Sequence, residues 1–237
     1  MHRTELFPAV VERVRQRVGR EHPFDVLEPR RTALVVIDMQ RYFVDPESPA
    51  SVPLAAAIVP AINHLASALR ERGGYVVWVR GTAHDPDEGW SVFNRDLMTP
   101  ERRERRARLM DGEGFAFWPE NDIRAGDGQV TKSRFSAFAP GSSSIRADLE
   151  ARGIDSILVA GTVTGVCCES SARDAMMLNY KVVMVSDALA AHSDEEHNAS
   201  LSLFYATFGD VQSVDEAIAS LDRGNISVSS SAQGGAS

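Results

Sequence analysis

The chain has 237 residues, of which 43% are hydrophobic and 24% charged, a composition typical of a globular protein with a sizeable core. Its formal net charge of -8 offers no basic surface to nucleic acid or anionic lipid, so we expect a small-molecule partner, no nucleic acid and no membrane. The two cysteines are sequence neighbours, which disfavours a structural disulfide and predicts a cytoplasmic protein. No apolar run approaches the roughly 20 residues of a membrane span, and the N-terminus lacks a signal peptide's apolar core.

Three regions are predicted along the chain. Residues 1–30 form a helical extension, residues 31–223 form one α/β domain, and residues 224–237 form a Ser- and Gly-rich tail whose composition predicts disorder. Within the extension, apolar residues recur at helical spacing over residues 5–18. This apolar side has no obvious place on an α/β core, so we expect it to cover a sheet edge or a partner chain.

Six short apolar runs alternate with helical patterns along the domain. The runs are continuously apolar, which indicates strands buried on both faces. The expected strands cover residues 33–37, 75–79, 129–132, 157–160, 181–185 and 210–212, and helices are expected over residues 54–72, 142–152, 194–208 and 214–221. This alternation predicts a doubly wound parallel sheet of about six strands with helices on both faces, a Rossmann-like arrangement of three layers.

The pattern loosens between residues 80 and 127, where aromatic residues are scattered among turn residues. One helix is clear within this region. Thr99 is its expected N-cap and Pro100 its first residue, and it carries the basic stretch ERRERRAR. The stretch could be an anion-binding patch, but we interpret it as a solvated helix face with interleaved glutamates, because the whole chain is acidic, and we assign it no role in a site.

The stretch GTVTGVCCESSARDAM, which begins at Gly161, follows a buried strand and opens a helix. Cys167 therefore lies where strand turns into helix. Unpaired backbone N–H groups and the positive end of the helix dipole favour a thiolate there, as a nucleophile requires. The alternative is that Cys167 and Cys168 simply pack beneath the helix, because free cysteine is among the most buried residue types.

Two further reactive side chains occupy strand ends. Asp38 ends the first strand, Lys132 ends the third, and Cys167 follows the fourth. Ligands bind outside the carboxyl ends of the strands in a doubly wound sheet, so we expect these three residues to converge on one crevice. Taken singly, Asp38 could cap a turn and Lys132 could be a solvated lysine.

Three motifs, IDMQ, TKSRFSAF and GTVTGVCCESSARDA, resemble those of the isochorismatase-like cysteine hydrolase family. The resemblance extends from about residue 31 to residue 221. It implies a catalytic triad of Asp38, Lys132 and Cys167. It also implies a cis peptide bond between Thr162 and Val163, with the backbone N–H groups of Val163 and Cys167 forming an oxyanion hole, and it assigns the second cysteine to packing.

The reaction that this resemblance implies is cleavage of a C–N bond through a thioester, in a small amide, a carbamoyl or ureido compound, or a lactam. Loop residues that could form the substrate wall are Gln40, Phe43, Trp90, Phe135 and Phe138. Each aromatic residue among them could instead pack in the core. The family commonly forms dimers or tetramers, so we expect a homodimer or homotetramer.

Departures from the family pattern narrow these expectations. Nicotinamidase-like members hold a metal with an Asp-x-His pair and a further histidine, whereas here His84 stands alone beside Asp85, so we expect no metal and no cofactor. Isochorismatases proper cleave a vinyl ether and lack the nucleophilic cysteine, so Cys167 disfavours that alternative. A catalytically idle binding protein is the other alternative. Gly165 stands where many members carry an amide side chain, which leaves the substrate open.

Overall fold

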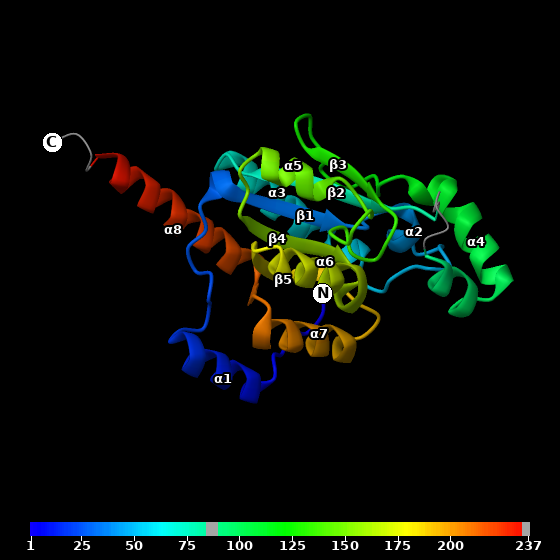
Figure 1. The fold of residues 1–237 in the computed structure, drawn as a ribbon, viewed down its shortest axis with the longest axis horizontal. Coiled ribbons are helices and arrows are strands. Elements are labelled where there is room, and N and C mark those ends of the chain that lie inside the picture. Colours follow the sequence, from blue (N-terminus) through cyan, green and yellow to red (C-terminus); the bar gives the residue numbers. More distant parts are fainter. Residues whose placement is uncertain (84–89, 234–237) are drawn as a thin grey trace.

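A six-stranded parallel sheet forms the centre of the structure, a computed structural model that describes residues 1–83 and 90–233 (Figure 1). The strands are β1 (Thr32–Ile37), β2 (Tyr75–Gly81), β3 (Gly128–Lys132), β4 (Ser156–Thr162), β5 (Lys181–Ala190) and β6 (Asp210–Gln212). They lie in the order β3-β2-β1-β4-β5-β6, and every neighbouring pair is parallel. The predicted doubly wound sheet is therefore confirmed.

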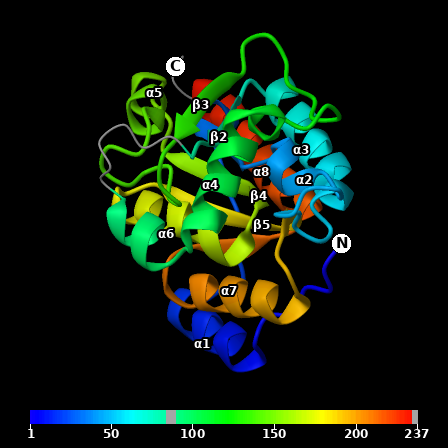
Figure 2. The same cartoon turned by 90° about the vertical axis from the view of Figure 1, so that its right-hand side faces the viewer.

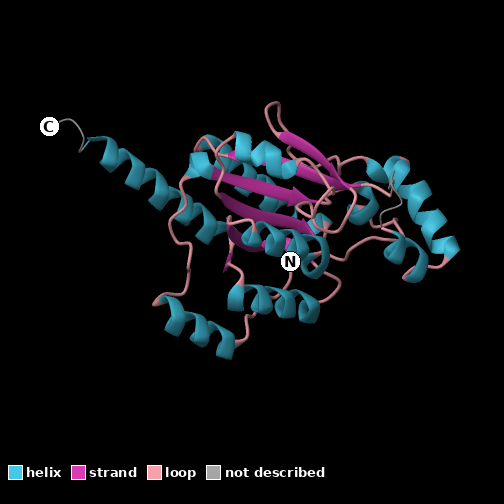
Figure 3. Cartoon of the chain, in the orientation of Figure 1, coloured by secondary structure: helices cyan, strands magenta, loops and turns pink. Residues whose placement is uncertain are grey.

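Helices cover both faces of this sheet (Figure 3). On one face, α5 (Ile145–Ala151), α6 (Glu169–Met177) and α7 (Asp194–Thr207) share a core with Val35 and Ile37 of β1. On the other face, α3 (Val59–Glu71) and α8 (Val214–Gln233) share a core with Leu34 and Val36. Strand β1 is therefore buried on both sides, which explains its continuous apolar run. No helix of the described chain combines the length and apolar character that crossing a bilayer requires.

The N-terminal helix α1 (Pro8–Val18) packs against α7 of the same chain (Figures 1 and 2). Val14 is fully buried in this contact. The expectation that the apolar side of this helix covers a sheet edge or a partner chain is therefore wrong, because the outer side of α7 accommodates it. Two histidines fasten the extension: the Nδ1 atom of His2 lies 2.6 Å from a carboxylate oxygen of Asp194, and that of His22 lies 3.1 Å from one of Asp210.

The last helix is longer than predicted. Helix α8 continues through Gly224 to Gln233, where the sequence predicted the start of a disordered tail, and residues 234–237 lie outside the described residues. Gly224 marks a close contact and not a helix end, because a Cβ atom there would clash with the backbone of Leu27. The Leu27 N–H donates a hydrogen bond to the Ser220 carbonyl at 3.0 Å, so this segment is docked on α8. The distal turns of α8 extend from the body (Figure 1).

Two short helical elements complete the region of the site. Helix α2 (Arg41–Val44) follows β1 directly, and α4 (Pro100–Asp111) begins at the predicted proline. The side chain of Thr99 accepts a hydrogen bond from the Arg102 N–H, as its predicted N-cap role requires. Both helices lie beyond the carboxyl ends of the strands (Figures 1 and 2).

Candidate active site

Asp38 directly follows β1 and is 1% exposed. Its backbone φ of 56° lies in the left-handed region, which aspartate tolerates better than most residues. The Asp38 N–H donates a hydrogen bond to the Val79 carbonyl of β2 at 2.8 Å. The residue is thereby fixed at the carboxyl edge of the sheet, where a ligand would bind.

Lys132 ends β3, which lies at the edge of the sheet beside β2. Its neighbour on β2 is Gly81, where a Cβ atom would lie 3.3 Å from the Oδ1 atom of Asp38. Because Gly81 has no side chain, the lysine reaches across β2 to β1. Its Nζ atom lies 2.9 Å from Asp38 Oδ2 and donates a hydrogen bond to the Arg134 carbonyl at 3.1 Å.

Cys167 lies in a π-helical turn (Thr164–Cys168) that joins β4 to α6. The Nζ atom of Lys132 donates to its Sγ atom at 3.4 Å, so one ammonium contacts both the carboxylate and the thiol. The Ser171 hydroxyl holds the turn from the other side. It donates to the Cys167 carbonyl at 2.7 Å and accepts from the Ala137 N–H at 3.0 Å. The structure thus brings Asp38, Lys132 and Cys167 together.

The end of β4 shapes the other side of the thiol. Gly161 has a φ of 112°, and a Cβ atom there would clash with the Ile37 backbone, so β4 and β1 approach closely at this point. The next peptide bond, between Thr162 and Val163, is cis. Val163 and Cys167 both face the same cavity.

Burial sets the protonation state of this group. Desolvation raises the pKa of Cys167 to about 12; Lys132 opposes this shift and Asp38 adds to it. Burial would lower the pKa of Lys132, but the charges of Asp38 and Cys167 raise it overall. In the resting protein Cys167 is therefore a thiol and Lys132 an ammonium. Burial of Cys167, which is 5% exposed, thus acts against the thiolate that the helix dipole favours.

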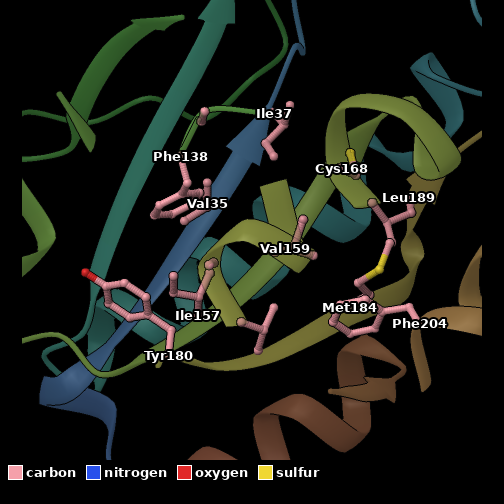
Figure 4. Close-up of a cluster of buried hydrophobic side chains, with 14 of the residues drawn as sticks. Val35, Ile37, Phe138, Ile157, Val159, Cys168, Tyr180, Met184, Leu189 and Phe204 are labelled. Atoms are coloured by element: carbon pink, nitrogen blue, oxygen red, sulfur yellow. The ribbon is translucent and has the colours of Figure 1, made fainter. Parts of the chain in front are cut away.

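The neighbouring Cys168 is fully buried in the core that the sheet shares with α6 and α7 (Figure 4). Desolvation raises its pKa well above the ordinary value for a thiol. Of the two cysteines, Cys167 contributes to the cavity lining and Cys168 does not. Only Cys167 is therefore placed to meet a ligand.

A cavity of about 520 Å³ opens onto Cys167. Three of the predicted substrate-wall residues line it: Phe43, Trp90 and Phe135. The rings of Trp90 and Phe135 meet edge to face, with their centroids 4.7 Å apart. This aromatic wall makes the cavity partly apolar.

Two predicted substrate-wall residues do not line the cavity. Gln40 is fully buried, and its side-chain amide bonds both to the Gly81 N–H, at 2.7 Å, and to the Gly81 carbonyl, at 3.1 Å. It therefore joins β1 to the end of β2 and has no free polar atom for a substrate. Phe138 is buried in the core beside Tyr180 (Figure 4). For both, the prediction is corrected.

Helix α4 supplies a wall of the cavity that the sequence analysis did not identify. Its basic stretch was assigned no role in a site, yet Arg102, Arg105 and Arg106 line the cavity, with Leu109 and Met110 following on the same side. The spacing of these residues, at i, i+3, i+4, i+7 and i+8, is the sequence signal of a single helix face. Tyr42 and His192 also line the cavity, and no sequence pattern indicated them.

The expected absence of a metal depended on His84 and Asp85, which lie outside the described residues. Within residues 1–83 and 90–233, no three His, Cys, Asp or Glu side chains gather closely enough to hold a metal ion. The donor set at Cys167 is itself a poor one for a metal, because the ammonium of Lys132 occupies the space between carboxylate and sulfur.

With this fold and cavity established, comparison with known proteins defines the class. Residues 32–216 match the isochorismatase domain family. The isochorismatase family protein YwoC of Bacillus subtilis (strain 168) is 31% identical over 191 residues, which cover 79% of this chain and 92% of YwoC. The chain belongs to the isochorismatase family.

Several relatives carry a hydrolase activity in their names. The crystal structure of a cysteine hydrolase from Pseudomonas syringae pv. phaseolicola 1448A superposes with a TM-score of 0.75 at 31% identity, covering 84% of this chain and 95% of that one. The ureidoacrylate amidohydrolase RutB of Pseudomonas savastanoi pv. phaseolicola is 28% identical over 207 residues, which cover 80% of this chain and 83% of RutB. The chain is therefore similar to cysteine hydrolases and amidohydrolases of its family.

Proposed function

We propose that this protein is a cysteine-dependent amidohydrolase that cleaves a C–N bond of a small amide, carbamoyl or ureido compound, or lactam through a thioester. The observation that carries the proposal is the contact of one buried ammonium, Lys132, with both Asp38 and Cys167 in the lining of a cavity. A thiol, a carboxylate and a fixed cation in contact are the parts that nucleophilic acyl transfer needs. The amidohydrolase among the relatives supports this reaction class.

The first half of the reaction moves one proton and forms one bond. Because the resting sulfur is a thiol, it must lose its proton as it attacks. Asp38 is placed to accept it, since its Oδ1 atom has no hydrogen-bond partner among the described residues. The sulfur then bonds to the carbonyl carbon, and the backbone N–H groups of Val163 and Cys167 stabilise the oxyanion. Lys132 stays protonated and balances the negative charge.

The second half returns the proton. Asp38 donates it to the leaving nitrogen, the C–N bond breaks, and ammonia or an amine departs from a thioester on Cys167. Asp38, again a carboxylate, removes a proton from a water molecule that attacks the thioester carbon. The carboxylic acid product leaves, and the sulfur regains a proton from Asp38. Asp38 therefore acts as a base and then as an acid in forming the thioester, and again as a base and then as an acid in hydrolysing it.

Release of ammonia or amine from a panel of primary amides, carbamoyl compounds and lactams tests this proposal. Cys167→Ala is expected to lower hydrolysis at least about a thousandfold, because the nucleophile is removed. Cys168→Ala is the matched control and should keep most of the activity, since this thiol is fully buried in the core. Hydrolysis that survives Cys167→Ala, or iodoacetamide labelling that favours Cys168, would contradict the proposal.

A further inference from the structure

Three guanidinium groups of α4 face the cavity that holds Cys167. Arg102, Arg105 and Arg106 lie on one side of the helix, and all three contribute to the cavity lining. Arg108, on the same helix, does not belong to this lining. The basic stretch therefore has one face that is part of the site and another that is not.

The described lining of the cavity is cationic, although the whole chain carries a net charge of -8. Lys132 and Asp38 offset each other at 2.9 Å, and Asp38 is the one carboxylate among the described lining residues. Within the described chain, the three α4 arginines form no ion pair with a carboxylate of the protein. Their positive charge is thus available to a ligand, and a cleft lined by one sign of charge attracts the opposite sign.

Arg106 is the member of this set that is fixed closest to the reacting groups. Its Nη2 atom donates a hydrogen bond to the Thr82 carbonyl at 3.3 Å, and its guanidinium lies 5.5 Å from the centre of the Phe93 ring. Met110, one turn further along α4, is near Gly81: a Cβ atom at Gly81 would lie 3.3 Å from both Met110 and Asp38. This turn of α4 therefore lies beside the carboxylate that Lys132 binds.

Partial burial makes an anionic ligand favourable at Arg106. Desolvation lowers the pKa of this guanidinium, while the nearby acidic groups of Tyr42, Cys167 and Asp38 oppose the shift. A cation removed from water is costly unless an anion pairs with it. A guanidinium fork matches a carboxylate with two parallel hydrogen bonds, which fixes the orientation of the ligand as well as its position.

We propose that the substrate carries a carboxylate at the end remote from the scissile carbonyl, and that Arg106 pairs with this carboxylate while Arg102 and Arg105 attract it into the cavity. The inference rests on the proposed function, since it assigns a substrate class to the same site. The amide carbon lies at Cys167, the carboxylate lies at the α4 wall, and the aromatic wall of Trp90 and Phe135 covers the apolar middle of the molecule.

Protection of Cys167 from iodoacetamide measures this binding without any turnover. Succinate, glutarate and adipate are the probes, and the corresponding uncharged diamides are their matched controls. We expect at least one dicarboxylate to slow alkylation of Cys167 more than its diamide does. Arg106→Gln should raise the half-protecting concentration about tenfold or more, as expected for a lost charge-assisted pairing. Arg105 is exposed, so Arg105→Gln should raise the half-protecting concentration less. This second variant keeps the inference testable if Arg106→Gln fails to fold.

Arg108→Gln is the matched control, because it removes the same charge from the same helix outside the cavity lining. It should leave protection unchanged. Equal protection by diamides and dicarboxylates, or equal effects of Arg106→Gln and Arg108→Gln, would overturn the inference.

Kinetics separate this inference from the proposed function. Succinamate and glutaramate carry an amide and a carboxylate, and their methyl esters lack the charge. We expect kcat/KM to be higher for an acid than for its ester, with Arg106→Gln raising KM for the acid alone. If the amide bonds of the esters and of the acids are hydrolysed equally fast, the proposed function is supported and the carboxylate site is refuted. If dicarboxylates protect Cys167 in an Arg106-dependent way but no amide in the panel is hydrolysed, the anion site stands and the proposed amidohydrolase reaction falls.

Discussion

At Cys167, burial and the cationic surroundings act on the thiol in opposite directions. Desolvation favours the neutral form, whereas the ammonium of Lys132 and the following helix favour the anion. Desolvation is the larger effect, so the pKa stands near 12 and the proton stays on sulfur until a base takes it. A buried, protonated thiol reacts slowly with oxidants in solution. It becomes a nucleophile when a base, here Asp38, removes its proton.

We predict that alkylation of Cys167 by iodoacetamide accelerates about tenfold per pH unit between about pH 7 and pH 10. The raised pKa means that the protonated thiol dominates across this range, and only the small thiolate fraction, which grows with pH, reacts. Mass spectrometry of the Cys168→Ala variant gives the rate from a single thiol. A rate that is level over this range would show that the thiolate already exists in the free protein.

The residues that face the cavity were predictable to different degrees. Asp38 and Lys132 could be found because parallel strands bring their carboxyl ends to one edge, whatever the loops do. Arg106 was missed because the basic stretch was weighed as a whole and not by helix face. Gln40 and Phe138 were misplaced because the direction of a loop side chain depends on contacts such as the Gly81 backbone, which no local pattern encodes.

At the scale of elements, strand β5 shows how a non-local contact extends a predicted strand. The apolar pattern predicted its end at Val185, yet β5 continues to Ala190. Its pairing with β4 shifts register between Val159 and Gly161 and resumes beyond Asp187, so the strand regains its partner. The Asp187 carboxylate accepts a hydrogen bond from the Val214 N–H at 2.8 Å, at the start of α8. The sequence shows that the apolar run is interrupted at Asp187, but it does not show that Val214 is the hydrogen-bond partner of this residue.

Gly224 provides a test of helix docking. We predict that Gly224→Ala destabilises the protein by about 1–3 kcal/mol, although alanine is the better helix former by about 1 kcal/mol, because the added Cβ would clash with the backbone of Leu27. Urea unfolding followed by circular dichroism measures the change.

Ile226→Ala is the control in the same helix. Ile226 is 69% exposed, so its replacement should change the free energy of unfolding by no more than about 0.5 kcal/mol. If Gly224→Ala instead stabilises the protein, as helix propensity alone predicts, then the close approach of α8 to Leu27 does not require glycine at this position.

On the scale of the whole molecule, α8 gives a physical reason for assembly that α1 does not. The apolar side of helix α1 packs against α7, whereas α8 extends beyond the body of the domain (Figure 1). Isolated helices are marginal in water, so contact of this projecting part with a second copy would stabilise it.

We predict a homodimer or homotetramer, with a molar mass in multi-angle light scattering that is a multiple of the 25.9 kDa chain. Deletion of the residues after Gly224 should shift the population towards the single chain. A full-length protein that scatters as one chain at every concentration would refute this prediction.

The projecting helix also affects how the protein moves through solution. A rod attached to a rounded body increases the hydrodynamic radius far more than it increases the mass, so even one chain of this outline would leave a gel-filtration column early (Figure 1). Calibration against spherical standards would then overestimate the mass. The sedimentation coefficient and the diffusion coefficient would have to be combined, since friction cancels from their ratio and only the mass remains.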